Sequence, residues 1–290
     1  MLMLLLSPCF LKAQQEVLIY ENDIVNSRFP GDKTMGKKVN RGNVPFVGAP
    51  SLEIYLSEDT SAEKTGILLI PGGGYSVIVF DGEGVNNAKQ LNKKGYNAFV
   101  LKYRLPSDST MIDKSMGPLQ DAQQAMLYLR THAKELGINP NKIGVMGFSA
   151  GGHLASTLAT HFDPPAIEVP EGMSVRPDFQ VLVYPVISMK EELTHGGSRK
   201  ALLGNSPSED LTLKFSNEMQ VSENTPPAYL THSADDTVVD VDNSIKYFEA
   251  LRAKKVPVEM HIYPKGNHGF IFRQPGWINP LFDWLEANGW

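Results

Sequence analysis

Short apolar runs rich in β-branched residues recur along the chain, and each is bounded by residues that favour turns. Runs of this length and composition are typical of β-strands that are buried on both faces. The pattern predicts strands at residues 52–56, 66–70, 98–101, 143–146, 179–183, 228–231 and 258–262.

Longer segments with apolar residues at helical spacing lie between these runs. Residues 118–136 begin with a proline, which is favoured in the first turn of a helix, and they carry an apolar stripe. Residues 241–253 follow Asp240, which we expect to cap a second helix. Because continuous apolar strands alternate with helices, the chain is predicted to be an α/β protein with a mostly parallel sheet covered by helices on both faces.

Two segments do not fit this alternation. Residues 188–227 are weakly periodic and are interpreted as an insertion over the strand ends, either a small lid or a solvated excursion. Residues 1–11 are almost wholly apolar, too short to span a bilayer, and followed by polar residues. Residues 1–13 are therefore predicted to be a secretory signal cleaved after Ala13, with a buried N-terminal strand as the alternative.

Composition narrows the class of protein. A length of 290 residues allows two small domains or one large α/β domain, and 42% hydrophobic with 20% charged residues is typical of globular proteins. The net charge of −5 provides no basic surface for nucleic acid. No apolar run reaches the length of a membrane-spanning helix. Cys9, the single cysteine, can form no disulfide within the chain.

The strongest local signal for chemistry is the sequence Gly147-Phe148-Ser149-Ala150-Gly151. It follows a predicted strand directly and precedes a run of small residues with helical character. This is the Gly-x-Ser-x-Gly elbow in the strand–turn–helix context that it requires, where a sharp turn exposes the serine hydroxyl. We interpret Ser149 as a nucleophile rather than as part of a tight structural turn.

A second signal, residues 71–75 (Pro-Gly-Gly-Gly-Tyr, hereafter the glycine loop), follows the strand predicted at 66–70. Glycines at a strand end allow backbone N–H groups to turn into a cleft, as in half of an oxyanion hole. The alternatives are a phosphate-binding loop and a flexible turn. A phosphate loop would need Gly-Lys-Ser/Thr after the glycines, and Tyr75-Ser76-Val77 does not supply it.

An acid and a histidine follow later strands in the order that this elbow predicts. Asp235 and Asp236 come after the strand at 228–231, and His268 comes after the strand at 258–262. Neighbouring residues of an extended chain point in opposite directions, so one of the two aspartates is expected to reach His268. Asp235 and Asp236 are both candidates for this acid at this point.

The other six histidines are weaker candidates. His153 lies one helical turn beyond Ser149 and is expected to support the elbow by packing or hydrogen bonding. His232 ends the strand before the two aspartates, and His261 lies within a predicted strand. The remaining three, His132, His161 and His195, have no recognisable partner pattern. No two histidines stand at zinc-binding spacing beside a carboxylate, so no metal mechanism is expected.

Together these motifs resemble the α/β-hydrolase superfamily, and within it the secreted bacterial carbohydrate acetyl esterases of the acetyl-xylan esterase or lipase/esterase type. The resemblance covers the chain from about Val44 onward. Besides the glycine loop, the elbow and the Asp236 and His268 loops, it rests on Lys102-Tyr103-Arg104-Leu105, Pro118-Leu119-Gln120-Asp121-Ala122, Gly152-His153-Leu154-Ala155 and Tyr184-Pro185-Val186.

The resemblance implies one α/β-hydrolase domain over residues 14–290, with Ser149 as nucleophile, His268 as base and Asp236 as acid. It implies oxyanion-hole donors at the N–H groups of Gly73, Gly74 and Ala150. It also implies a small or polysaccharide ester as substrate, no cofactor, and a periplasmic or secreted location.

The sequence leaves two alternatives to an esterase function. A serine peptidase could use the same fold, although such enzymes usually carry an additional domain. A non-catalytic binding protein of this fold is expected to have lost Ser149 or His268, and both residues are present.

Overall fold

The computed structural model of the protein describes residues 15–59 and 63–290. The predicted signal at residues 1–13 lies outside the described residues. Across the two described ranges, no helix combines the length and the apolar character needed to cross a membrane.

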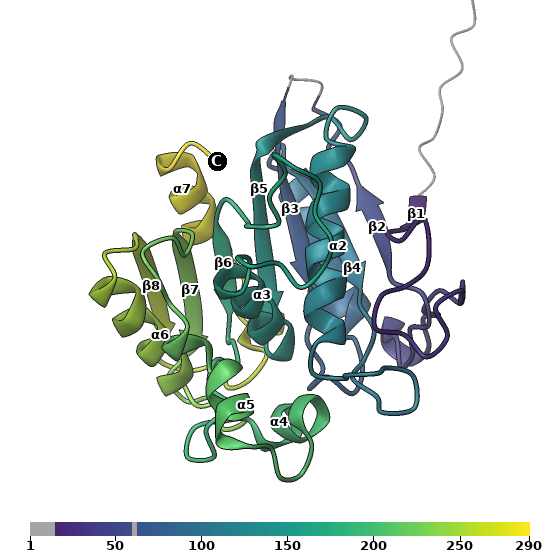
Figure 1. Cartoon of the computed structure of the whole chain (residues 1–290). Helices are drawn as coiled ribbons and strands as arrows, with labels where there is room; N and C mark the ends of the chain where they lie inside the picture. Colours follow the sequence, from purple (N-terminus) through teal and green to yellow (C-terminus); the bar gives the residue numbers. More distant parts are fainter. Residues whose placement is uncertain (1–14, 60–62) are drawn as a thin grey trace, which may run out of the picture.

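A single eight-stranded sheet forms the centre of the fold (Figure 1). The strand order is β1-β2-β4-β3-β5-β6-β7-β8, and strands β3 to β8 are parallel while β2 pairs antiparallel with both β1 and β4. The strands are β1 Gln15–Leu18, β2 Ser51–Tyr55, β3 Lys64–Ile70, β4 Asn97–Lys102, β5 Ile138–Phe148, β6 Gln180–Val183, β7 Ala228–Ser233 and β8 Val258–Tyr263. The predicted strands are all present, which confirms the α/β fold class.

The helices connect these strands in the alternation that the sequence predicts. They are α1 Asn86–Asn92, α2 Gly117–Thr131, α3 Ala150–Thr160, α4 Gly196–Leu203, α5 Glu209–Lys214, α6 Asp242–Ala253 and α7 Asn279–Ala287. Shorter turns are η1 Asn40–Gly42, η2 Phe80–Val85, η3 Asn217–Met219 and η4 Phe270–Phe272, of which η2 is π-helical. The segment at 188–227 contains α4, α5 and η3, and the first two lie below the sheet in Figure 1.

Both faces of the sheet are covered, as two glycines of β5 show. A Cβ on Gly147 would lie 2.6 Å from the Cβ of Ala155, so this face of β5 packs against α3. A Cβ on Gly144 would strike the ring of Phe179, which itself packs against Trp284 of α7. Successive residues of a strand face opposite sides of the sheet, and Gly144 and Gly147 are three positions apart. The two glycines therefore face opposite sides, and α3 and α7 cover opposite faces of the sheet.

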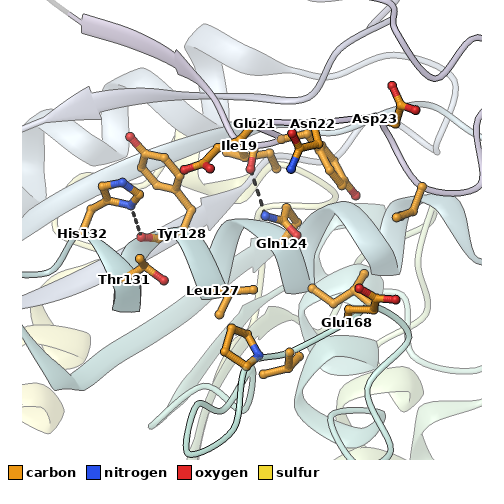
Figure 2. A pocket seen from close by; sticks show the side chains of 15 residues that line it. Ile19, Glu21, Asn22, Asp23, Gln124, Leu127, Tyr128, Thr131, His132 and Glu168 are labelled. Atoms are coloured by element: carbon orange, nitrogen blue, oxygen red, sulfur yellow. Dashed lines mark hydrogen bonds between the residues drawn. The ribbon is translucent and has the colours of Figure 1, made fainter.

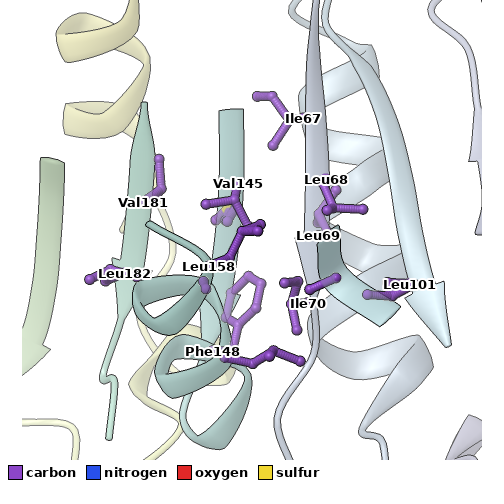
Figure 3. Close-up of a cluster of buried hydrophobic side chains, with 14 of the residues drawn as sticks. Ile67, Leu68, Leu69, Ile70, Leu101, Val145, Phe148, Leu158, Val181 and Leu182 are labelled. Carbon is purple, nitrogen blue, oxygen red and sulfur yellow. The ribbon is translucent and has the colours of Figure 1, made fainter. Parts of the chain in front are cut away.

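The central strands are buried on both sides, which explains their continuous apolar sequences. Residues Ile67 to Ile70 of β3 are all 0% exposed, and Val145 of β5 and Val181 of β6 are equally buried (Figure 3). Removing this apolar surface from water is the main force that holds the sheet and its helices together.

Two helix boundaries differ from the prediction. The helix predicted over 118–136 ends at Thr131, and the chain then forms turns up to Gly137, whose φ of +63° lets it enter β5. The second helix begins at Asp242 with Val241 as its N-cap. Asp240 therefore precedes the cap, although its carboxylate still accepts from the Asp242 N–H at 2.9 Å.

A buried ion pair connects the end of β4 to α2. Asp121 accepts hydrogen bonds from the Arg104 guanidinium at 2.6 Å and from the Arg104 N–H at 2.9 Å. It also accepts from the Tyr20 hydroxyl at 2.9 Å. The side chains of Asp121 and Arg104 are 0% and 3% exposed. Arg104 and Asp121 belong to two of the motifs on which the family resemblance rests. Their contact shows that these motifs stabilise the fold.

We expect Asp121→Ala to lower the free energy of unfolding by about 3–5 kcal/mol, because it leaves the Arg104 charge buried without a partner. Urea denaturation followed by circular dichroism measures this loss. Lys246→Ala is the matched control, since it removes an ion pair to Glu249 in which both side chains are more than half exposed. The control is expected to cost less than about 1 kcal/mol. Equal losses in the two variants would contradict the assignment.

Candidate active site

The elbow holds Ser149 in a strained backbone conformation at the end of β5. Its φ of 53° and ψ of −120° are unusual for a residue with a side chain and cost about 1–3 kcal/mol. Its N–H donates to the Val183 carbonyl, and its carbonyl accepts from the Val186 N–H, each at 3.0 Å. The sharp turn leaves no room for side chains at Gly147 and Gly151, where a Cβ would lie 2.3 Å and 2.1 Å from backbone oxygens.

A chain of hydrogen bonds joins Ser149 to residues of two distant loops. The Ser149 Oγ lies 3.0 Å from His268 Nε2, and His268 Nδ1 lies 2.8 Å from Asp236 Oδ2. The three residues come from the ends of β5, β7 and β8, so the parallel sheet brings them to one edge. This geometry suits a serine hydroxyl that transfers its proton to an imidazole oriented by a carboxylate.

Asp236 rather than Asp235 is the aspartate that reaches His268. Its other oxygen accepts from the N–H groups of Val238 and Val239, both at 2.9 Å. His232 Nε2, at 3.2 Å, contacts the same oxygen as His268. Burial by itself would raise the pKa of Asp236, but the hydrogen bonds from His232, His268 and the backbone hold that pKa well below its usual range. Asp236 is therefore a carboxylate at neutral pH.

Asp235 connects the acid loop to the histidine loop instead. Its carboxylate accepts from the Asn267 N–H at 2.7 Å and from the Ser233 hydroxyl. The Asn267 side chain in turn accepts from the N–H of Thr237 at 3.1 Å and of His268 at 2.6 Å. These contacts fix the position of His268 relative to Asp236.

The glycine loop lies directly against the elbow. A Cβ on Gly72 would fall 2.8 Å from the Ser149 Cβ, so only glycine permits this approach. Gly73 and Gly74 have φ of +122° and +64°. Across residues 15–59 and 63–290, their N–H groups donate to no protein acceptor. Together with Ala150 at the start of α3, they are candidate donors to an oxyanion.

His153 links the glycine loop to two other parts of the molecule. The carbonyl of Phe215, in the 188–227 segment, lies 2.8 Å from Nε2 and can only accept, so Nε2 donates. Nδ1 therefore accepts from the Tyr75 hydroxyl at 2.8 Å. Burial lowers the pKa of His153 to about 4, so the ring is neutral at pH 7. The supporting contact expected from the sequence is present.

Sequence reasoning missed a buried carboxyl group beneath the site. Glu83 in η2 accepts from the Gly72 N–H at 2.6 Å and from the Tyr184 hydroxyl at 3.1 Å. The Tyr184 ring lies 4.8 Å from the His268 ring, centroid to centroid. Burial raises the pKa of Glu83 to about 7, despite these hydrogen bonds and the nearby His268. No local pattern marks Glu83, because its partners are 11 and 101 positions away.

An open groove lies elsewhere, between residues 19–25, α2 and residues 167–170 (Figure 2). Its volume is about 620 Å³, and it is lined in part by Glu21, Gln124, Tyr128 and Glu168. Its lining includes no serine and none of the residues that contact Ser149. The hydrogen-bonded arrangement of Ser149, His268 and Asp236 therefore identifies the candidate site better than concavity does.

Comparison with protein families matches residues 52–251 to the family described as BD-FAE. Endo-1,4-beta-xylanase B of Butyrivibrio fibrisolvens is 40% identical over 76% of this chain and 34% of its own length. The acetylxylan esterase of Xylanibacter ruminicola is 39% identical over 79% of this chain and 45% of its own length. The chain thus spans between a third and a half of these curated relatives.

Among solved structures, an acetyl ester-xyloside bifunctional hydrolase from Caldicellulosiruptor lactoaceticus has a TM-score of 0.81 and 37% identity. The match covers 95% of this chain and 97% of the other. A deep-sea metagenomic α/β hydrolase matches with a TM-score of 0.63 and 26% identity over 95% of this chain and 97% of its own. These neighbours agree with the α/β-hydrolase fold described above.

We expect stability to depend on the ionisation of Glu83. The pKa of this carboxyl group is near 4.5 in the unfolded state and about 7 in the folded state. The contribution of Glu83 to stability therefore falls as the pH rises between those values. The shift corresponds to roughly 3 kcal/mol. The amide of the Glu83→Gln variant is neutral at every pH. The unfolding free energy of the variant minus that of the native protein should therefore increase by roughly 3 kcal/mol from pH 4.5 to pH 8.

Urea denaturation of both proteins at pH 4.5, 6 and 8 measures this difference, and any constant effect of the substitution cancels from it. Stability curves that run parallel across this range would show that Glu83 ionises normally.

Proposed function

The chain belongs to the BD-FAE family, and on that premise we propose that it is a serine esterase that removes acetyl groups from acetylated plant polysaccharide or oligosaccharide such as xylan. The observation that carries the chemistry is the chain of hydrogen bonds from Ser149 through His268 to Asp236. The substrate class is supported by the relatives described as an acetylxylan esterase and an acetyl ester-xyloside hydrolase.

In the first step, Ser149 Oγ attacks the acyl carbonyl while His268 Nε2 accepts the hydroxyl proton. The Asp236 carboxylate holds the Nδ1–H of the ring and stabilises the imidazolium. The carbonyl oxygen becomes negative next to the N–H groups of Ala150, Gly73 and Gly74, which are already free to donate. The tetrahedral intermediate then collapses, and His268 gives the proton to the departing sugar oxygen.

In the second step, water attacks the acetyl-serine ester. His268 takes a proton from this water and returns it to the Ser149 oxygen as acetate leaves, which restores the starting state. The residues need no metal or cofactor to complete either step.

The function is tested by acetate release from acetylated xylan, alongside p-nitrophenyl esters of rising acyl length and an aminoacyl p-nitroanilide. We expect acetate release, and a rate on the acetyl ester far above that on the octanoyl ester. Rates that rise with chain length would favour a lipase, and anilide cleavage without acetate release would favour a peptidase.

Ser149→Ala is expected to lower turnover at least about a thousandfold, because no other hydroxyl lies within hydrogen-bond distance of His268 Nε2 in the described chain. Circular dichroism should show an unchanged fold. Acetyl esterase activity that survives in this variant would end the serine mechanism.

The two neighbouring aspartates provide a matched pair of variants that tests which one acts as the catalytic acid. Asp236→Asn is expected to lower kcat about 10⁴-fold, because the amide no longer holds His268 in the tautomer that accepts the serine proton. Asp235→Asn should cost tenfold or less, since its carboxylate contacts Ser233 and Asn267 rather than His268. Steady-state kinetics on p-nitrophenyl acetate measures both, and the reverse ranking would move the acid role to Asp235.

A further inference from the structure

We propose that His195 is a substrate-binding residue whose Nε2–H donates a hydrogen bond to a sugar oxygen of the acetylated carbohydrate. The proposal rests on the esterase function proposed above and adds a residue from the 188–227 segment, outside the nucleophile, base, acid and oxyanion donors.

His195 lies beside the glycine loop although it comes from another part of the chain. It is the N-cap of α4, in the segment that lies below the sheet in Figure 1. Its Cε1 is 3.8 Å from the point that a Cβ on Gly74 would occupy, which is van der Waals contact. His268 and Asp236 are close enough to influence its pKa electrostatically. The half-buried imidazole therefore borders the space where an ester would be attacked.

The helix cap decides which nitrogen carries the proton. The Ser198 N–H donates to Nδ1 at 3.2 Å, and the Ser198 hydroxyl lies 2.8 Å from the same atom. An Nδ1 that accepts from a backbone N–H has no proton, so the neutral ring carries its proton on Nε2. Burial and the neighbouring His268 lower the pKa of His195, which keeps the ring neutral at pH 7.

The Nε2–H has no hydrogen-bond acceptor among residues 15–59 and 63–290. A half-buried donor without a partner can be satisfied by a ligand that supplies an oxygen. In the mechanism proposed above, the acetyl carbonyl oxygen takes the N–H groups of Gly73, Gly74 and Ala150. The oxygens left without donors are the hydroxyl, ring and glycosidic oxygens of the sugar, and a neutral N–H group suits these uncharged acceptors.

Two substitutions separate the cap from the donor. In His195→Asn, the amide oxygen can replace Nδ1 as the acceptor for Ser198 N–H, and asparagine is a favoured N-cap, but nothing replaces the Nε2–H. In His195→Gln, the longer amide can place an N–H near the Nε2 position, while the cap is weakened. His195→Asn thus removes the hydrogen-bond donor and keeps the helix cap. His195→Gln keeps the donor and weakens the cap.

The measurement is kcat/KM on an acetylated xylo-oligosaccharide divided by kcat/KM on p-nitrophenyl acetate, which has no sugar. A loss of folded enzyme lowers both values equally and cancels from this ratio. We expect His195→Asn to lower the ratio about tenfold, the effect of one neutral hydrogen bond to substrate. His195→Gln should restore most of that ratio even if its melting temperature falls.

A ratio unchanged in His195→Asn overturns the role of His195, whether both activities fall together or neither changes. A ratio that falls equally in both variants also overturns it, because the donor would then not be the cause. Failure of the proposed function is recognised separately in the native protein, which would then release no acetate from the oligosaccharide, or would do so after Ser149→Ala.

Discussion

The candidate site depends on the strained turn at Ser149, because the ends of β3, β5 and β6 meet at this turn. The positive φ of Ser149 is maintained by backbone hydrogen bonds to Val183 and Val186 on the neighbouring strand end. A Cβ on Gly151 would lie 2.1 Å from the Ile70 carbonyl oxygen, so α3 begins in contact with the end of β3. The buried strands on either side supply the free energy that keeps this conformation.

Around the turn, polar groups are held by contacts between loops rather than within them. Asp236 receives two imidazole and two backbone hydrogen bonds, which keep it charged in a largely buried place. Within the described part of the chain, the Glu83 carboxyl group has one backbone N–H and one hydroxyl as hydrogen-bond donors, so burial dominates and its pKa rises. The two carboxyl groups thus differ in charge near neutral pH because of the number and kind of their donors.

The segment at 188–227 contributes to the site in two ways. Through Phe215 it receives the hydrogen bond of His153, which itself holds Tyr75 of the glycine loop. Through α4 it brings His195 next to Gly74. In the proposed mechanism the strand ends provide the reacting groups, whereas contacts with a sugar are expected to come from this segment outside the sheet. Such a division lets loop residues alter the choice of substrate while the strand ends stay the same.

The sequence by itself determined the features that depend on the order of neighbouring residues along the chain. Continuous apolar runs predicted the strands, the Gly-x-Ser-x-Gly context predicted the elbow, and alternation predicted that one aspartate would reach His268. The end of α2 at Thr131, the pairing of β1 and the surroundings of Glu83 were decided only by the tertiary structure. Glu83 and Tyr184 are 101 positions apart, and the tautomer of His195 matters only because α4 lies beside Gly74. Burial and hydrogen-bond partners depend on distances in space, which local patterns do not contain.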